Sequence, residues 1–469
     1  TITLTIDGSN DTPTVSNVAV SVLETDFAGM SNLVYTSTTS LTASDVDATD
    51  TYTFAKSNFA GTTGEVGLQV SLVQSDVLFM QAYNLASAGN ATALIALKAA
   101  FLDLISTPAI AAIVGASNTL STLTADITSA SDFATLINVI NANSALSLSA
   151  TTTSVTVTAE ATAAQTATLE AIGAINITVN TDGTYSLSTP LVNNLAEGEV
   201  AIITFGYTAT DNSGTATATS DVKTVSLTVT GTNDTPTVSD VAVNVSESTF
   251  ADVSGMSNLV YTSTTSLTAS DVDATDTYTF AKSNFAGTTG EVGLQVSLVQ
   301  SDVLFMQAYN LASAGNATAL IALKAAFLDL ISTPAIAAIV GASNTLSTLT
   351  ADITSASDFA TLINVINANS ALSLSATTTS VTVTAEATAA QTATLESLGA
   401  INITVNADGS YSLSSSLVNN LADGEVAKIT FGYTATDSSG TVTATSEAKT
   451  VTLTVTGTND TPTVSAYTE

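Results

Sequence analysis

The feature that most constrains this chain is a long internal repeat. The run Gly-Thr-Asn-Asp-Thr-Pro-Thr-Val-Ser begins at Gly231 and again at Gly457, so the period (457 − 231) is 226 residues. A near copy begins at Gly8, 223 residues before Gly231, because the second repeat carries three extra residues around 251–254. Self-similarity at a fixed period indicates tandem modules.

The module boundaries are expected at the Asn-Asp-Thr-Pro segments. Residues 30–170 recur without change as residues 256–396, which indicates a recent duplication. The chain opens with a strand-like alternation instead of an initiator Met, so we expect it to be a piece of a longer protein. The predicted parts are 1–13 (end of a preceding module and linker), 14–232 (first module), 233–458 (second module) and 459–469 (start of a following linker).

Composition excludes several kinds of chemistry. The chain has no Cys and no His, so disulfides, thiolate metal sites and imidazole bases are absent. It has 40 Asp and Glu against 7 Lys and Arg, a formal charge of −33, which disfavours binding to nucleic acids and to anionic membranes. The apolar stretch 91–115 is interrupted by Lys98, Asp103 and Pro108, so we expect no membrane insertion.

Enzyme activity is not expected either. Ser and Thr nucleophiles need a base, and neither Lys56 nor Lys98 follows a recognisable Ser-x-x-Lys pattern. Paired carboxylates can cleave glycosides, but here they lie in turn-like loops without an aromatic platform, and the chain has no Trp. Thr-rich runs such as 215–219 are typical of the wet face of a sheet, which we favour over an ice-binding surface.

Within a module, the pattern predicts short strands with turns between them, which is typical of an antiparallel β-sandwich. Asp182-Gly183 is a strong hairpin signal between two of the strands. Hydrophobic residues make up 45% of the chain and include many Val and Ile, in agreement with strands that have one buried face. The expected strands are 14–23, 33–41, 51–54, 65–73, 154–158, 174–180, 184–187, 200–210 and 222–230.

Residues 75–150, and their copy 301–376, have the helical period instead. Helix starts are predicted at Ser75-Asp76, Asn90, Thr107-Pro108 and Ser131-Asp132, from capping residues and from Pro in a first turn. Each module is therefore a β-sandwich split by an α-helical insert. The apolar positions Leu94, Leu97, Phe101 and Ile105 are expected to form the core of the insert, and a ligand groove or self-association surface there is the open alternative.

The loop Asp45-Val46-Asp47-Ala48-Thr49-Asp50 places alternate carboxylates about 6 to 7 Å apart along an extended backbone. Carboxylates so close repel one another unless a hard cation lies between them, and Ca²⁺ accepts six to eight oxygens. An EF-hand is excluded, because Asp50 stands where its Gly is required and the twelfth position is Lys56. The alternative interpretation is that Asp simply favours turns.

A family resemblance adds to this interpretation. The run 231–238 resembles the linker of bacterial cadherin-like and Ig-like repeats. The runs 182–185, 195–199 and 205–214 together resemble the second half of a VCBS-type repeat, as found in large secreted adhesins of the RTX class. The resemblance covers most of each module except the helical insert. Glycine-rich nonapeptides of a calcium β-roll are absent.

The resemblance implies Ca²⁺ at module junctions. A linker would supply Asn and Asp oxygens, the next module a Glu from its first strand and an Asp-x-Asp loop, and the preceding module a Glu and an Asp. Asp50 and Asp276 either bind or cap a turn. The implied ligands are Asn10, Asp11, Glu24, Asp45, Asp47 and Asp50 at the first junction; Glu199, Asp211, Asn233, Asp234, Glu247, Asp271, Asp273 and Asp276 at the second; and Glu425 and Asp437 at the next.

We therefore expect two extender modules of a bacterial cell-surface adhesin, exported to the outside by type I secretion, as the RTX resemblance implies. Calcium-bridged linkers would stiffen the array and project a distal binding region for adhesion and biofilm formation. The partners would be neighbouring modules of the same chain. The alternative is a binding module whose helical insert recognises a peptide, a glycan or another copy of itself.

Overall fold

The computed structural model describes residues 4, 7–28, 33–58, 66–75, 77–116, 119–252, 259–273, 275–284, 292–342, 345–418 and 421–459. The chain forms two compact units. The first comprises Thr1–Thr235 together with two loops from later in the sequence, Asp271–Thr277 and Asp437–Ala444. The second comprises Pro236–Ser270, Tyr278–Thr436 and Thr445–Glu469. Each repeat is β-rich with a helical insert, as the sequence predicts.

The first repeat has a large sheet and a small one. The large sheet has the order β2-β12-β11-β6-β8-β7, with β5 also paired to β11, and the small sheet has the order β3-β10-β9. A short pair, β1-β4, precedes the acidic loop. The strands are β1 (Thr14–Val15), β2 (Val18–Leu23), β3 (Leu33–Thr36), β4 (Ala43–Ser44), β5 (Tyr52–Ser57), β6 (Val66–Gln74), β7 (Leu146–Ala150), β8 (Val155–Glu160), β9 (Asn176–Val179), β10 (Tyr185–Thr189), β11 (Val200–Asp211) and β12 (Lys223–Thr230).

Strand β11 is the central strand of the large sheet, because it pairs with three other strands. Its first half lies between β12 and β6, and its second half pairs with β5, so that Asp211 is opposite Tyr52. Its alternate residues are buried in the core between the sheets, including Phe205 and Tyr207. The expected antiparallel arrangement holds except for β2, which pairs with β12 in parallel. Those two strands are separated by most of the repeat, so no short turn forces them to be antiparallel.

The small sheet contains the predicted hairpin. Strands β9 and β10 pair antiparallel across Asp182-Gly183. Gly183 has a φ of 82°, and Asp182 Oδ1 accepts a hydrogen bond from the Thr184 amide at 2.9 Å. Only Gly adopts such a φ without a steric penalty, which is why this dipeptide is a hairpin signal.

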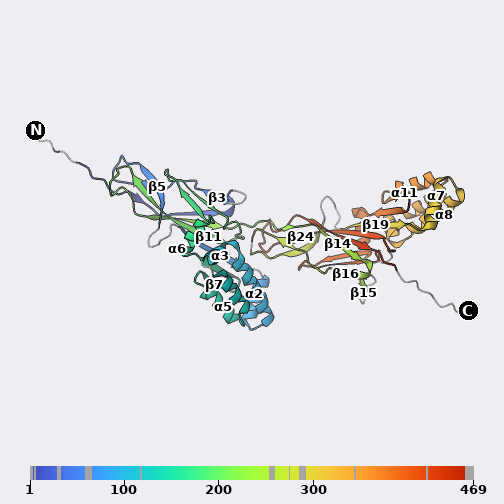
Figure 1. Ribbon diagram of the computed structural model, residues 1–469, viewed down its shortest axis with the longest axis horizontal. Coiled ribbons are helices and arrows are strands. Elements are labelled where there is room, and N and C mark those ends of the chain that lie inside the picture. Colours follow the sequence, from blue (N-terminus) through green and yellow to red (C-terminus); the bar gives the residue numbers. More distant parts are fainter. Residues whose placement is uncertain are drawn as a thin grey trace. The chain divides into compact units, whose positions relative to one another are not determined.

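The insert folds as a helical layer with its own core. Figure 1 shows α2, α3 and α5 gathered beside β7 in the first repeat. Two predicted caps are present: Asn90 Oδ1 accepts from the Ala93 amide at 3.0 Å, and Asp132 Oδ1 from the Thr135 amide at 2.8 Å. Asp76 lies outside the described residues. The helices are α1 (Val77–Ser87), α2 (Ala91–Ser106), α3 (Pro108–Gly115), α4 (Leu120–Ser129) and α5 (Phe133–Ala142).

Several elements of the first repeat were not predicted, among them the short strand β4. Helix α4 and strand β7 lie in the segment assigned to the insert, and helix α6 (Ala163–Ala171) lies between two strands. Strand β7 extends the large sheet through its pairing with β8. Helix α6 begins with a reciprocal capping box between Thr162 and Gln165, and the Gln165 side chain also donates to the Ile113 carbonyl at 2.8 Å.

The second repeat has the same topology, with the sheet order β14-β25-β24-β19-β21-β20 and with β18 on β24. Its small sheet, β15-β16-β23-β22, includes the short strand β15, where the first repeat has an isolated bridge between Ala28 and Val34. Its elements are β13 (Thr237–Val238), β14 (Val241–Ser246), β15 (Ala251–Asp252), β16 (Leu259–Thr262), β17 (Ala269–Ser270), β18 (Thr279–Ser283), β19 (Val292–Gln300), α7 (Val303–Ser313), α8 (Ala317–Ile331), α9 (Pro334–Gly341), α10 (Leu346–Ser355), α11 (Phe359–Ala368), β20 (Leu372–Ala376), β21 (Val381–Glu386), α12 (Ala389–Ser397), β22 (Ile401–Val405), β23 (Tyr411–Ser415), β24 (Val426–Thr436) and β25 (Lys449–Thr456).

No single helix among the described residues has the length and apolar character needed to cross a membrane. Two bent pairs, α2 with α3 and α8 with α9, pass that test only when each pair is taken together. Their bends are 78° and 79°.

Candidate metal centres

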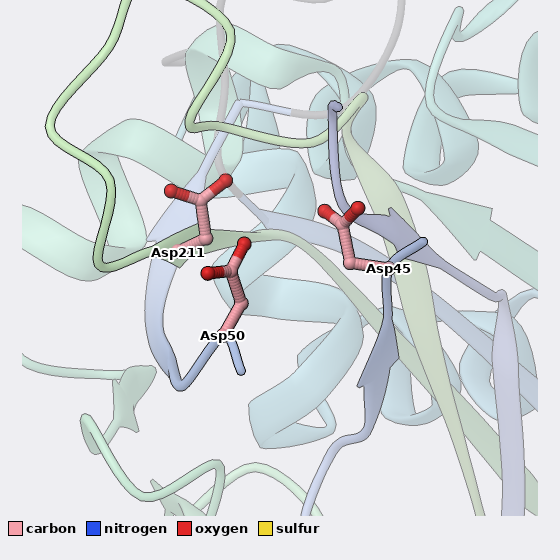
Figure 2. A group of neighbouring side chains, drawn as sticks. All are labelled: Asp45, Asp50 and Asp211. Atoms are coloured by element: carbon pink, nitrogen blue, oxygen red, sulfur yellow. The ribbon is translucent and has the colours of Figure 1, made fainter. Parts of the chain in front are cut away.

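Three carboxylates converge at one end of the first repeat. Asp45 and Asp50 lie in the loop that follows β4, and Asp211 ends β11; each contributes an oxygen to a group in which all lie within 4.8 Å of one another. Figure 2 shows the three side chains reaching the same space from two separate segments of the chain. Asp211 is buried, and the other two are partly exposed.

The fold positions these groups from both sides. Pairing of β5 with β11 puts Asp211 opposite Tyr52, two residues after Asp50. The preceding linker closes the group, because Asn10 Nδ2 donates to Asp211 Oδ2 at 3.1 Å and the Asp11 amide donates to Asp47 Oδ2 at 2.9 Å. Five of the six residues expected at this junction, all except Glu24, therefore lie in this group, in its loop or in the linker segment bonded to them.

The same arrangement recurs 226 residues later, within the residues assigned to the first unit. Asp271, Asp276 and Asp437 form the second group of three carboxylates within 4.8 Å. Asn233 Nδ2 donates to Asp437 Oδ2 at 3.2 Å, and the Asp234 amide donates to Asp273 Oδ2 at 2.8 Å.

Several oxygens in these groups are buried without a hydrogen-bond partner. Such orphaned acceptors are costly unless something else binds them. One of them belongs to Asp273, whose side chain is only 1% exposed. The unpartnered atoms are Asp45 Oδ2, Asp50 Oδ2, Asn233 Oδ1, Asp271 Oδ2, Asp273 Oδ1 and Asp276 Oδ2.

The pKa values of several of these carboxyl groups are raised, because burial and neighbouring carboxylates disfavour their ionised form. Burial, followed by repulsion from Asp211, Asp47 and Asp45, raises the pKa of Asp50 above its ordinary value. Burial and the neighbouring Asp437 raise the pKa of Asp276 to about 6. Burial also raises the pKa of Asp273 to about 7, and it raises those of Asp271 and Asp234.

Asp211 is the exception in the first group. Its pKa is lowered, chiefly by a hydrogen bond from the Ser213 side chain, so this carboxylate stays ionised. The Ser213 amide also donates to Asp211 Oδ1, at 2.8 Å. Within the first group, Asp211 is therefore the carboxylate that most favours its ionised form.

Two buried glutamates lie at the other end of the first repeat. Glu24 is 6% exposed, and its Oε2 accepts from the Thr232 amide at 3.4 Å; burial raises its pKa to about 8, and Asp234, Asp273 and Glu199 add repulsion. Glu199 is 1% exposed, and burial raises its pKa to about 7. Its oxygens accept from the amides of Val73 and Ala196 at 3.0 and 3.1 Å.

The grouping of the ligands differs from the expectation. Glu24 does not join Asp45 and Asp47 but lies by Thr232, because β2 runs parallel to β12 and ends beside Thr230. Glu247 likewise accepts from the Thr458 amide at 3.2 Å, in the linker that follows its own repeat.

Asp211 and Asp437 were expected at the junction that follows their repeat, but each lies at the start of it. They lie with the acidic loop at the start of their own repeats, because β11 and β24 run the full length of the sheet away from Glu199 and Glu425. Glu425 Oε2 accepts from the Ala422 amide at 2.9 Å, and burial raises its pKa. Metal binding by any of these residues remains a prediction.

The chemistry of the donor set fits a hard cation. Each group offers carboxylate oxygens, an Asn side chain and nearby backbone, which are the ligands Ca²⁺ takes, and neither group contains a nitrogen or sulfur ligand for softer metals. Among the described residues, the two ion pairs lie elsewhere: Lys56 with Glu170 at 2.8 Å and Lys282 with Glu396 at 2.9 Å.

No family model and no curated protein matches the chain. Among solved structures, the chain is similar to the adhesive subunit of the CFA/I fimbria of enterotoxigenic Escherichia coli, with 11% identity over 59% of this chain and 64% of that one and a TM-score of 0.18. It is also similar to the cadherin-like domains 1 to 4 of zebrafish RET, with 8% identity, coverage of 96% and 51%, and a TM-score of 0.15.

An endo-fucoidan hydrolase of glycoside hydrolase family 107 is a further match, with 10% identity over 61% of this chain and a TM-score of 0.15. The chain spans only 22% of that hydrolase. Likenesses at these TM-scores carry no argument about function, which therefore rests on the acidic groups themselves.

Proposed function

We propose that the chain is a calcium-stiffened extender of a bacterial cell-surface adhesin, which projects a distal ligand-binding region for adhesion and biofilm formation. The observation that carries the proposal is the pair of carboxylate groups, Asp45–Asp50–Asp211 and Asp271–Asp276–Asp437, each with oxygens within 4.8 Å. Buried oxygens without partners in both groups support it.

Stiffening follows from which segments the groups join. Asn10 and Asp11 belong to the linker, and they are hydrogen-bonded to Asp211 and Asp47 of the folded repeat. A Ca²⁺ ion bound by Asp45, Asp50 and Asp211 would remove the repulsion among them and tie the linker to the loop. Without the ion, the carboxylates repel one another and the linker is held by hydrogen bonds alone, including those of Asn10 to Asp211 and Thr217 and of Asp11 to Asp47.

The alternative function through the helical insert depends on exposure of its apolar residues. Leu94, Leu97, Phe101 and Ile105 are 9%, 0%, 0% and 2% exposed, so they are the core of the insert and do not line an open groove. This burial favours the extender over a binding module.

Terbium luminescence tests the ion site directly, because Tb³⁺ replaces Ca²⁺ at oxygen sites and a nearby Tyr sensitises it. Tyr52 is paired with Asp211 across the strands and follows Asp50 by two residues, so it is the expected sensitiser of the first site. We expect sensitised emission that Ca²⁺ competes away and that Tyr52→Phe weakens.

Asp45→Asn combined with Asp50→Asn should abolish the first-site emission. Asp132→Asn is the matched control, because that carboxylate caps α5 away from the groups and Asn is an equally good cap. Absence of emission, or equal emission in the double variant, would refute the site. Small-angle scattering with Ca²⁺ and then with EDTA tests the stiffening. A maximum dimension that changes with neither would refute the extender mechanism but not ion binding.

A further inference from the structure

One loop sequence occurs twice in this chain in two different environments. The loops 45–50 and 271–276 are identical in sequence, yet Val46 is 81% exposed and Val272 only 40%. Asp47 is partly exposed, whereas its counterpart Asp273 is 1% exposed. Because the local sequence is the same, other residues must cover the second loop.

Three side chains near the end of the first repeat provide that cover within the first unit. Asn194 Nδ2 donates to the Val272 carbonyl at 2.7 Å. Thr275 Oγ1 donates to Glu199 Oε1 at 3.2 Å, and Gln74 Nε2 lies 3.5 Å from the Thr275 carbonyl. We call Gln74, Asn194 and Glu199 the loop receptor.

The loop receptor is built by the fold of its own repeat. Glu199 is fixed by the amides of Val73 and Ala196, which leaves Oε1 able to accept one more hydrogen bond. Glu425 keeps the equivalent bond to Ala422 in the second repeat. The two repeats therefore offer the same acceptor before any loop arrives.

The loop also lies beside the helical insert. Gln74, which contacts the loop, is buried with 8% of its surface exposed. Beside the receptor, Leu78, Phe79 and Ala82 of α1 line one wall of a cavity of about 330 Å³, and residues 275–277 line another. The loop thus lies against both the sheet end and the insert.

We infer that Gln74, Asn194 and Glu199 form an interaction surface whose partner is the acidic loop at the start of another copy of the repeat. Recognition is by hydrogen bonds to two backbone carbonyls and to one Thr hydroxyl, and it uses no cation. This inference rests on the proposed extender and adds to it a contact between repeats that persists when Ca²⁺ is removed by a chelator. In the second repeat, Gln300 and Glu425 would contact the acidic loop of a further copy in the same way.

Thiol reporters test the inference, because the chain contains no Cys. Val272→Cys and Val46→Cys place the same reporter in the same local sequence, one loop covered and one not. In EDTA we expect Val272→Cys to be alkylated about twofold more slowly, in line with exposures of 40% and 81%. Adding Asn194→Ala and Thr275→Val should raise its rate to that of Val46→Cys. Thr275→Ser, which keeps the hydroxyl, should preserve the protection.

The matched control is Thr49→Val, the same change in the first loop, which should leave both rates unaltered. Circular dichroism should show that every variant is folded. Equal rates for the two reporters in EDTA would overturn the inference. Protection that appears only with Ca²⁺ would also overturn it, while leaving the proposed function intact. Protection in EDTA from a chain that binds no Tb³⁺ would support the receptor and refute the ion site.

Discussion

Replacing Glu24 with Gln should stabilise the first unit in chelator. Glu24 is buried, and its pKa is raised from 4.5 to about 8, chiefly by burial and then by Asp234, Asp273 and Glu199. At pH 7 this carboxyl is ionised in the unfolded chain and protonated in the folded one. The interval from its ordinary pKa of 4.5 to pH 7 is 2.5 units. At about 1.36 kcal/mol per unit, ionisation of the unfolded chain lowers the free energy of unfolding by about 3 kcal/mol. Screening by nearby water reduces this free energy, and we expect a stabilisation of about 2 kcal/mol.

The sign follows from linkage. An acid whose folded pKa is raised binds more protons in the folded state, so stability falls as pH rises from about 4.5 to 8. Glu24→Gln should therefore gain most above pH 8 and little below pH 4.5. Glu24 accepts one hydrogen bond, from the Thr232 amide, and the Gln carbonyl oxygen can take it over.

Denaturant unfolding in EDTA between pH 5 and pH 8.5 measures this effect. The wild-type chain should lose stability across that range more steeply than Glu24→Gln. If Ca²⁺ binds near Glu24, the variant should also gain less from added Ca²⁺ than the wild type does. A variant that is neutral or less stable in EDTA at pH 8.5 would refute the reasoning, because it would mean that the buried carboxylate is not strained.

Three further predictions concern the fold. Gly183→Ala should cost about 2–4 kcal/mol, because a Cβ would lie 2.8 Å from the Leu41 carbonyl at a positive φ, whereas Gly89→Ala, in open space, should cost about 1 kcal/mol; thermal melts compare them. Phe101→Ala should lower the free energy of unfolding by about 3–5 kcal/mol, because Phe101 is fully buried. The first repeat should then unfold before the second, which calorimetry would show as two transitions. The control is Ile95→Ser, which should change stability by under about 0.5 kcal/mol because Ile95 is 68% exposed. Tyr207→Phe should cost about 1 kcal/mol in denaturant melts, because it removes the hydrogen bond from its hydroxyl to the Ser16 carbonyl at 2.5 Å.

Local signals in the sequence predicted much of the fold. Asn90 and Asp132 cap helices, and Asp182-Gly183 makes its hairpin, because each depends only on groups a few residues apart. Helix α4 was missed because its N-cap, Thr119, makes no side-chain cap bond and its Thr-rich sequence resembles a strand. Helix α6 could have been found, since its capping box is plain in the sequence.

The acidic residues were predicted one by one, but not in their groups. Whether Asp211 lies by Asp50 or by Asp234 depends on the direction and register of β11, which pairs Asp211 with Tyr52. The position of Glu24 depends on the parallel pairing of β2 with β12, about 200 residues later in the chain. Such pairings are long-range, and a single sequence carries no local signal for them.

The charge distribution is in agreement with the proposal that the acidic groups bind ions from solution. The chain's 7 basic residues are all Lys. Lys56 and Lys282 are paired with Glu170 and Glu396. Lys98 and Lys324 donate to backbone carbonyls near helix ends, including those of Ala130 and Ala356. Among the described residues, no Lys forms an ion pair with the two carboxylate groups.

Carboxylates fully exposed to water would repel one another only weakly. The fold instead buries the side chains of Asp211 and Asp437. It also leaves one oxygen of each neighbouring Asp in the two groups buried without a hydrogen-bond partner. Negative charge that is partly withdrawn from water, with no Lys beside it, destabilises a folded chain, and bound protons or cations relieve that destabilisation. At pH 8 the raised pKa values of Asp276 and Asp273, about 6 and 7, favour the ionised form of both, and the proposed cation would neutralise them. The ion dependence of stability should therefore be greatest at alkaline pH and should fade below pH 6, where protons take the place of the cation.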